Sequence, residues 1–161
     1  MKYLQYAKYL IKHKYYVLIE CFKRGIYWQG IKHDLSKFYP SEFIPYAPYF
    51  YGRYLKGDIK EYKPADLNGD IGYAWFLHQK RNKHHWHYWI LPQGQGKMKA
   101  LDMPMKYRKE MLCDWIGASK AQGNDLKVWY RKYKDKIQLH PETRKWVEAK
   151  IKSNLSTVKA L

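Results

Sequence analysis

Apolar residues recur at helical spacing along most of this chain. In residues 3–24 they fall three or four positions apart, from Leu4 and Ala7 to Val17 and Cys21, which predicts one long amphipathic helix. Gly25 is suited to end this helix, because glycine readily adopts the left-handed conformation found after helices. Similar spacing, with capping residues or proline at the starts, predicts further helices over residues 27–38, 69–90, 104–120, 124–137 and 141–155.

Two stretches interrupt the helical pattern. Four prolines and two glycines between residues 40 and 64 favour short helical turns and loops. The segment 92–100 contains Gly94 and Gly96 and is typical of a loop. No alternating strand pattern of useful length occurs. We therefore predict an all-α, compact, single-domain helical bundle over residues 1–161, with mobile loops near 52–68 and 92–102.

Charge and composition narrow the class of protein. The 161 residues include 31 Lys and Arg against 14 Asp and Glu, a formal net charge of +17. This charge points to anionic partners, which could be nucleotides, nucleic acid or a membrane surface, and does not choose among them. The many aromatic residues exclude disorder, and the lack of a long apolar run or leader predicts no membrane partner. Cys21 and Cys113 are too few for a disulfide framework, which favours the reducing cytoplasm.

Several ionisable residues fall on apolar helix faces. His13 lies between Leu10 and Val17 on the stripe of the first helix, and Asp114 follows Met111 by three residues. A buried carboxylate is costly unless it is paired or binds a cation. Each residue alone has an ordinary explanation, a core histidine or an aspartate paired with lysine. Their joint occurrence favours a metal site.

More histidines follow in two clusters. His33 and Asp34 are adjacent, and His78 and His85 are seven residues apart, within about 20° of one helix face. In a regular helix these two histidines are the expected ligands, whereas a break near Asn82 would also bring His84 inward. Imidazole and carboxylate suit Mn, Fe, Zn or Ni, so we expect one or two divalent transition-metal ions.

A known four-part signature is similar to His13, the adjacent His33 and Asp34, and Asp114. It belongs to the HD superfamily of metal-dependent phosphohydrolases, an all-α fold that binds one or two divalent cations with such residues. The additional histidines, His78 and the pair at 84 and 85, resemble those of binuclear members, including the HD-GYP phosphodiesterases. The chain also resembles a small family of bacterial and phage proteins through its segments HKYYV, HDLSKF, HHWHYW and EMLCDW.

The chain departs from those relatives at two points. The interval between His78 and the next histidines is shorter than in the HD-GYP enzymes, and no GYP motif follows. Some nucleotidase members have a catalytic Glu three residues after the HD doublet, where this chain has Lys37. Asp34 is the natural bridging ligand for two ions, and Lys37 is the candidate electrostatic stabiliser, or else a surface lysine.

Basic and aromatic neighbours are candidates for substrate binding. Arginine binds phosphate in a bidentate manner, and tryptophan can stack on a base, although at this spacing it is more often a core residue. The candidate residues are Lys14, Arg81, Asn82, Trp86, His140 and Arg144.

Three functions are compatible with these patterns. The first is a phosphohydrolase or phosphodiesterase acting on a nucleotide or cyclic nucleotide, with metal-bound hydroxide attacking phosphorus. The second is a module that captures a signalling nucleotide without hydrolysing it, as a phage anti-defence sponge would. The third is a basic nucleic-acid-binding protein with a structural histidine cluster. Weak nonspecific nucleic-acid binding is expected in every case, and oxygen chemistry, as in di-iron relatives of the HD fold, stays open.

Overall fold

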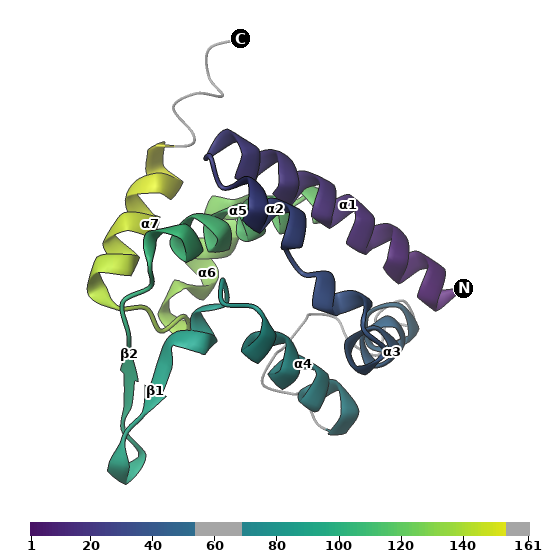
Figure 1. Cartoon of the computed structure of the whole chain (residues 1–161), viewed down its shortest axis with the longest axis horizontal. Helices are drawn as coiled ribbons and strands as arrows, with labels where there is room; N and C mark the ends of the chain where they lie inside the picture. The colour runs from purple at the N-terminus through teal and green to yellow at the C-terminus, as the bar shows by residue number, and fades with distance from the viewer. Residues whose placement is uncertain (54–68, 154–161) are drawn as a thin grey trace.

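Helices dominate the computed structural model, which describes residues 1–53 and 69–153 (Figure 1). The all-α prediction is confirmed. The α-helices are α1 (Lys2–Lys23), α2 (Tyr27–Lys32), α3 (Pro40–Pro48), α4 (Gly69–Arg81), α5 (Met105–Gln122), α6 (Leu126–Tyr133) and α7 (Pro141–Ser153). Shorter helical segments are η1 (Leu35–Phe38), η2 (Tyr49–Arg53), η4 (Trp86–Trp89), η5 (Gly94–Gly96) and η6 (Lys134–Lys136). Within the described ranges, every helix is too short or too polar to span a membrane.

The pair α1 and α5 forms the centre of the bundle, where the two helices make the most extensive contact between elements. The contact is close because Gly117 has no side chain: a Cβ at this position would lie 2.4 Å from Cγ2 of Val17. Fully buried apolar residues fill the space around this crossing. His13 of α1 and Asp114 of α5 therefore face the same interior space beside it.

The second predicted helix, over 27–38, is wrong as one continuous element. Its regular part, α2, ends before His33, and Asp34 adopts a left-handed conformation with φ of 53°. Aspartate tolerates this conformation better than most residues. Lys14 of α1 fixes the turn, since its Nζ donates to the backbone carbonyls of Ile31 (2.7 Å) and His33 (2.9 Å). The turn directs two adjacent side chains into the interior, which one regular helix would not do.

A similar break shortens the helix predicted over 69–90. The α4 helix ends one residue before Asn82, whose side-chain amide donates to the carbonyl of His78 at 2.8 Å. The chain then turns, with the backbone amide of His85 donating to the carbonyl of Asn82. The break near Asn82 considered in the sequence is therefore present, and it brings His84 inward together with His85.

The loop predicted for 92–102 is wrong in part, because a short hairpin occupies most of it. Strands β1 (Ile90–Pro92) and β2 (Met98–Ala100) pair in antiparallel register, with Ile90 opposite Ala100. The three-residue strands are too short to give a recognisable alternation in the sequence. Of the other predicted loop, 52–68, the first two residues end η2 and the rest lie outside the described residues.

The remaining helices differ from the prediction mainly at their ends. The α3 helix continues through Pro45 and Pro48, although prolines at this density predicted only short turns. The helix expected to reach residue 137 ends as α6, and η6 follows it. Behind the central pair, a second core of α5, α6 and α7 is built on Leu112, Tyr130 and Val147.

Candidate metal centre

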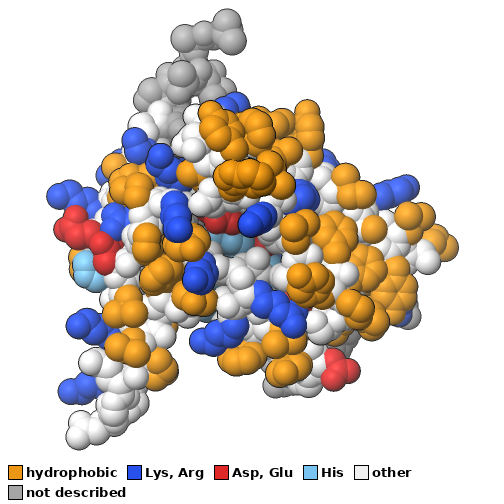
Figure 2. All heavy atoms as spheres, viewed as in Figure 1, with side chains coloured by type: hydrophobic (Ala, Val, Ile, Leu, Met, Phe, Trp, Pro, Cys, Tyr) orange, Lys and Arg blue, Asp and Glu red, His pale blue; other side chains and the backbone are white. Residues whose placement is uncertain are grey.

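Seven side chains from four separate segments converge beside the α1–α5 contact. They are the residues predicted as metal ligands: His13 from α1, His33 and Asp34 from the α2–η1 turn, His78, His84 and His85 from α4 and the following turn, and Asp114 from α5. All are buried except His85, which is partly buried. Figure 2 shows acidic and histidine side chains at the bottom of a hollow near the middle of one face, surrounded by lysine, arginine and apolar side chains.

The first group of ligands comprises His13, His33, Asp34 and Asp114, whose donor atoms all lie within 4.8 Å of one another. Nε2 of His13 is 3.1 Å from Oδ1 of Asp114, and Nε2 of His33 is 3.4 Å from the same oxygen. Two imidazole nitrogens thus face two carboxylates in one small volume. Such a set of nitrogen and oxygen donors can hold a divalent transition-metal ion.

The second group comprises Asp34 again, with His78, His84 and His85. Oδ1 of Asp34 is 3.4 Å from Nε2 of His78 and 3.3 Å from Nε2 of His84. Nε2 of His85 lies 2.8 Å from Nε2 of His78. The structure therefore brings both His84 and His85 to this group, as expected if the helix breaks near Asn82.

Asp34 belongs to both groups and faces each with a different oxygen. Oδ2 lies on the side of His13 (3.7 Å) and His33 (3.4 Å), whereas Oδ1 lies on the side of His78 and His84. This is the arrangement that a carboxylate needs to bridge two ions. Its unusual backbone conformation explains why one residue can reach both groups.

Glu110 supports one histidine of each group, and sequence reasoning missed it. Its Oε1 lies 3.2 Å from Nδ1 of His33 and 3.2 Å from Nδ1 of His84. These contacts orient both imidazoles so that their Nε2 atoms face the aspartates, as outer carboxylates do for metal-binding histidines. A signal was present: Glu110 precedes Asp114 by four residues and so shares its helix face.

Glu42 supports His78 in the same way and was also missed. Its Oε2 lies 2.8 Å from Nδ1 of His78, and its Oε1 accepts a hydrogen bond from Arg81 at 2.7 Å. The side chain is fully buried, and the hydroxyl of Ser36 donates to it at 3.0 Å. No spacing in the sequence relates Glu42 to the helix that carries His78, so this contact depends on how α3 and α4 pack.

The electrostatic balance of the cluster favours ionised carboxylates. Burial alone would lower the pKa of His33, but the facing Asp34, Asp114 and Glu110 outweigh it and raise the pKa to about 10. Burial alone would raise the pKa of both aspartates, yet the surrounding histidines hold each pKa well below its usual range. For His85, burial and the neighbouring histidines lower the pKa. A cation bound by the first group would compete with a proton on His33.

Lys37 lies against the cluster from η1. Its Nζ is 2.5 Å from Oδ2 of Asp34 and the side chain is mostly buried. Burial alone would lower the pKa of Lys37, but Asp34 outweighs it and keeps the pKa well above the usual value. A charged ammonium group is therefore fixed at the side of Asp34 that faces the first group.

Buried donor atoms without hydrogen bonds fit a bound cation. Among the described residues, no hydrogen-bond partner is found for Nε2 of His13, His33 or His84, or for Oδ1 of Asp34. Such atoms carry a desolvation cost unless they are satisfied. Coordination would satisfy all four at once, and the absence of thiolate ligands favours Mn, Fe, Zn or Ni sites over structural zinc.

The comparisons with known proteins identify the family. A model described as a family of unknown function, DUF5662, matches residues 2–153. The chain belongs to the DUF5662 family. The match includes all seven clustered residues and both supporting glutamates. The searches of curated proteins and of solved structures returned no match. Membership of the HD superfamily stays a prediction.

Three of the substrate-binding candidates have structural partners in this DUF5662 protein. Lys14 donates to the carbonyls of the α2–η1 turn, and Arg81 donates to Ser41 and Glu42. Asn82 donates to Ser36 at 2.8 Å and to the His78 carbonyl. These side chains position the cluster, because their polar groups are directed at the protein itself.

The other three candidates make their described contacts with residues outside the cluster. Trp86 packs against the α5–α7 core and stacks on His87, which agrees with the core reading of this tryptophan. His140 accepts a hydrogen bond from the backbone amide of Glu142 at the start of α7. Arg144 donates to the carbonyls of η6 and of residue 137. The structure therefore places none of them at the candidate centre, because each is used in packing or in joining α7 to the core.

Proposed function

We propose that this protein is a binuclear metal-dependent phosphohydrolase acting on a nucleotide or cyclic nucleotide. The observation that supports the proposal is Asp34, which faces His13 and His33 with one oxygen and His78 and His84 with the other. The positive net charge supports an anionic substrate.

Different residues of the cluster would have different roles in the hydrolysis of a phosphate ester. Divalent cations in such a centre lower the pKa of water and offset negative charge on a phosphoryl oxygen. Asp34 and Asp114 would hold the cations, and Glu110 and Glu42 would keep the histidines oriented. Lys37 supplies a fixed positive charge beside Asp34, where it stabilises charge that develops on the phosphate.

Capture of a nucleotide without hydrolysis is the second candidate, and the engagement of the carboxylates favours it. In the described part of the chain, the four carboxylates around the cluster all face histidines: Asp34, Asp114, Glu42 and Glu110. None is left to act as a general acid for a leaving group, whereas the ammonium group of Lys37, beside Asp34, would contribute to phosphate binding with or without hydrolysis. Nucleic-acid binding stays a prediction without a specific structural observation in its favour.

Elemental analysis is the first test of the metal centre. Protein purified without chelator should contain up to two equivalents of a transition metal, and the Asp34→Asn variant should lose both, because this residue serves both groups. The Asp135→Asn variant, which makes the same change at an exposed aspartate of η6, is the matched control and should keep its metal. A wild-type protein without stoichiometric metal under any loading condition would refute the proposal.

Incubation with candidate nucleotides separates hydrolysis from capture. Release of phosphate, or opening of a cyclic nucleotide, by the metal-loaded protein supports the phosphohydrolase. Intact nucleotide recovered after denaturing a stable complex supports capture instead. In the hydrolytic case, Lys37→Met should lower turnover while leaving metal content unchanged, since this side chain does not coordinate the ions.

A further inference from the structure

The surface formed by the first 53 residues carries no exposed acidic side chain. This segment contains only Glu20, Asp34 and Glu42 as acidic residues, and all three are buried. Glu20 is bound by Arg24 and by Lys120 of α5, and the other two belong to the candidate metal centre and its support. The exposed charged side chains of α1, α2, η1 and α3 are therefore all cationic.

Large apolar side chains are concentrated on the same segment. Of the 20 exposed large hydrophobic residues in the described chain, 13 lie within residues 1–44, about a third of that chain. On α1, the exposed Leu4, Ile11 and Tyr15 recur at intervals of seven and four and so share one face, with Ile11 63% exposed. Contiguous exposed apolar surface of this kind marks an interaction site.

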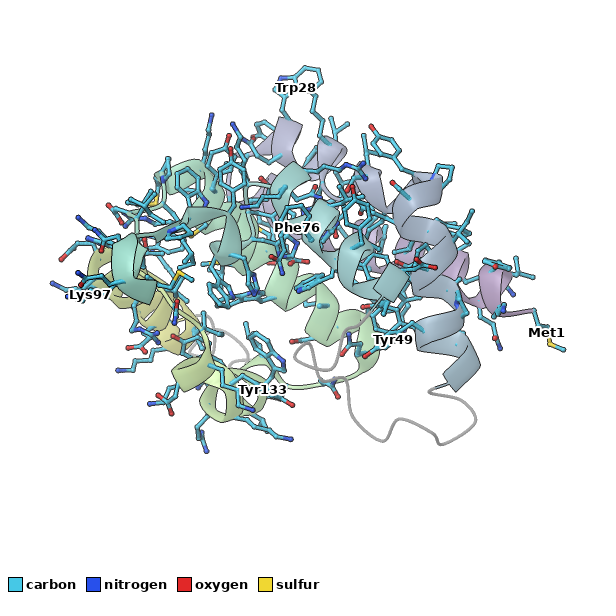
Figure 3. The ribbon with its side chains drawn as sticks, turned by 90° about the horizontal axis from the view of Figure 1, so that it is seen from below. Met1, Trp28, Tyr49, Phe76, Lys97 and Tyr133 are labelled. Carbon is cyan, nitrogen blue, oxygen red and sulfur yellow. The ribbon has the colours of Figure 1, made fainter. Side chains whose placement is uncertain are left out.

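The apolar surface continues from α1 onto α2. Phe22 near the end of α1 contacts Tyr27 at the start of α2, with ring centroids 4.9 Å apart. Beyond them, Trp28 is 71% exposed and Ile31 is also exposed. Figure 2 shows hydrophobic side chains gathered over this part of the molecule, and Figure 3 shows Trp28 projecting from it.

Lysines are interleaved with these apolar residues. Lys8 and Lys12 occupy the exposed face of α1 between Leu4 and Tyr15, and Lys32 follows Ile31 at the end of α2. Mixed apolar, aromatic and lysine side chains on one face are typical of helices that lie in the boundary between lipid headgroups and acyl chains. Lysine ammonium groups there attract anionic headgroups.

We propose that this face docks onto the surface of an anionic lipid bilayer. The occupant follows from charge and chemistry: a second copy of the chain would bring two cationic faces together, which is repulsive. A nucleic acid would bind the lysines and stack on the aromatic rings, but it would not bury the exposed aliphatic side chains of Leu4, Ile11 and Ile31. No membrane partner was expected from the sequence, which has no apolar run long enough to span a bilayer. The proposal departs from that expectation, since this face would lie on the bilayer without spanning it.

Vesicle co-sedimentation of the full chain is the test. Wild type should bind vesicles of mixed phosphatidylcholine and phosphatidylglycerol at least about tenfold more tightly than pure phosphatidylcholine vesicles, with a strong dependence on salt. The Trp28→Ser/Ile31→Ser variant should weaken binding to the anionic vesicles by at least about tenfold, since both apolar side chains would enter the lipid boundary. Lys8→Glu/Lys12→Glu should weaken it by a similar factor.

The matched control is Val128→Ser on α6. This valine is 63% exposed, between Ile31 and Trp28 in exposure, but it lies outside residues 1–44. It should bind vesicles as wild type does, and circular dichroism should show that every variant is folded. Equal binding of the double variants and wild type would overturn the proposal. The absence of vesicle binding by the wild type would also overturn it. In that case, a dimer that the Trp28 variant disrupts would identify a second copy of the chain as the partner, and binding only to single-stranded oligonucleotides would identify nucleic acid. No residue of the metal centre is altered, so this proposal can fail independently of the phosphohydrolase.

Discussion

Glu110 and Glu42 make a discriminating pair of substitutions, because they support different numbers of ligand groups. Glu110 contacts one histidine of each group, His33 and His84, both at 3.2 Å. Among the clustered histidines, Glu42 contacts only His78, at 2.8 Å. Glutamine has the same shape as glutamate but lacks its charge. Glu110→Gln should therefore weaken two cation sites, whereas Glu42→Gln should weaken one.

The size of the effect follows from the charge removed. An outer carboxylate raises the basicity of the imidazole it contacts and fixes its tautomer, and its loss typically costs about 10–100-fold in metal affinity. This factor corresponds to about 1.4–2.8 kcal/mol of binding free energy per site. In Glu110→Gln the loss should apply to both binding steps. In Glu42→Gln it should be confined to the step that involves His78, because this glutamate makes no contact with His13 or His33.

Competition with a chelator of known affinity, followed by calorimetric titration with Mn²⁺ or Zn²⁺, measures the two steps separately. Imidazole nitrogen shifts in the metal-free protein give a second readout, since those of His33 and His84 should change only in the Glu110 variant and those of His78 only in the Glu42 variant. The reasoning is refuted if Glu110→Gln affects a single step, or if Glu42→Gln weakens both equally while the two variants remain folded.

Three further predictions concern stability and can be checked by thermal or denaturant unfolding. Gly117→Ala should destabilise the fold by about 1–3 kcal/mol because its Cβ would lie 2.4 Å from Val17 Cγ2, whereas Gly94→Ala, with nothing within 4 Å, should be tolerated. Burial opposes ionisation of Glu20, but the bound lysines and arginine outweigh it and lower its pKa to about 2 from an ordinary 4.5, so its contribution is present above pH 4.5 and is lost as the pH falls toward 2. Glu20→Gln should remove this pH dependence, which amounts to at most about 3 kcal/mol. Asp125→Ala should cost about 0.5–2 kcal/mol, because its side chain accepts a hydrogen bond from a backbone amide at the start of α6.

Helical periodicity was sufficient to find the residues of the centre that lie on regular helices. His13 and Asp114 stand on apolar stripes, and spacing alone predicts that these helix faces are buried. It does not predict that α1 and α5 bury them against each other. His78 was predicted from its spacing of seven residues to His85 on one face of a predicted helix. These positions depend on helical periodicity, which can be read directly from the spacing of residues in the sequence.

The turns and the contacts that support the histidines were harder to predict from the sequence. Asp34 breaks a helix that spacing predicts to continue, because contacts from Lys14 to the turn outweigh the local preference. The part played by Glu42 depends on α3 packing beside α4, which no local pattern encodes. Arg81 adjoins a ligand in sequence, but adjacency does not show where a long side chain points, and here it points to Glu42.

The separation of the four ligand segments along the chain has a consequence for folding. His13 and Asp114 are about a hundred residues apart, so the centre can close only after most of the chain has collapsed, which places it among the slow, non-local contacts of the fold. An ion bound there would cross-link four segments in a chain whose two cysteines are free. It would act chiefly on the rate of unfolding, because coordination that forms late is also the first to be broken. Resistance to proteolysis would then report whether the centre is loaded.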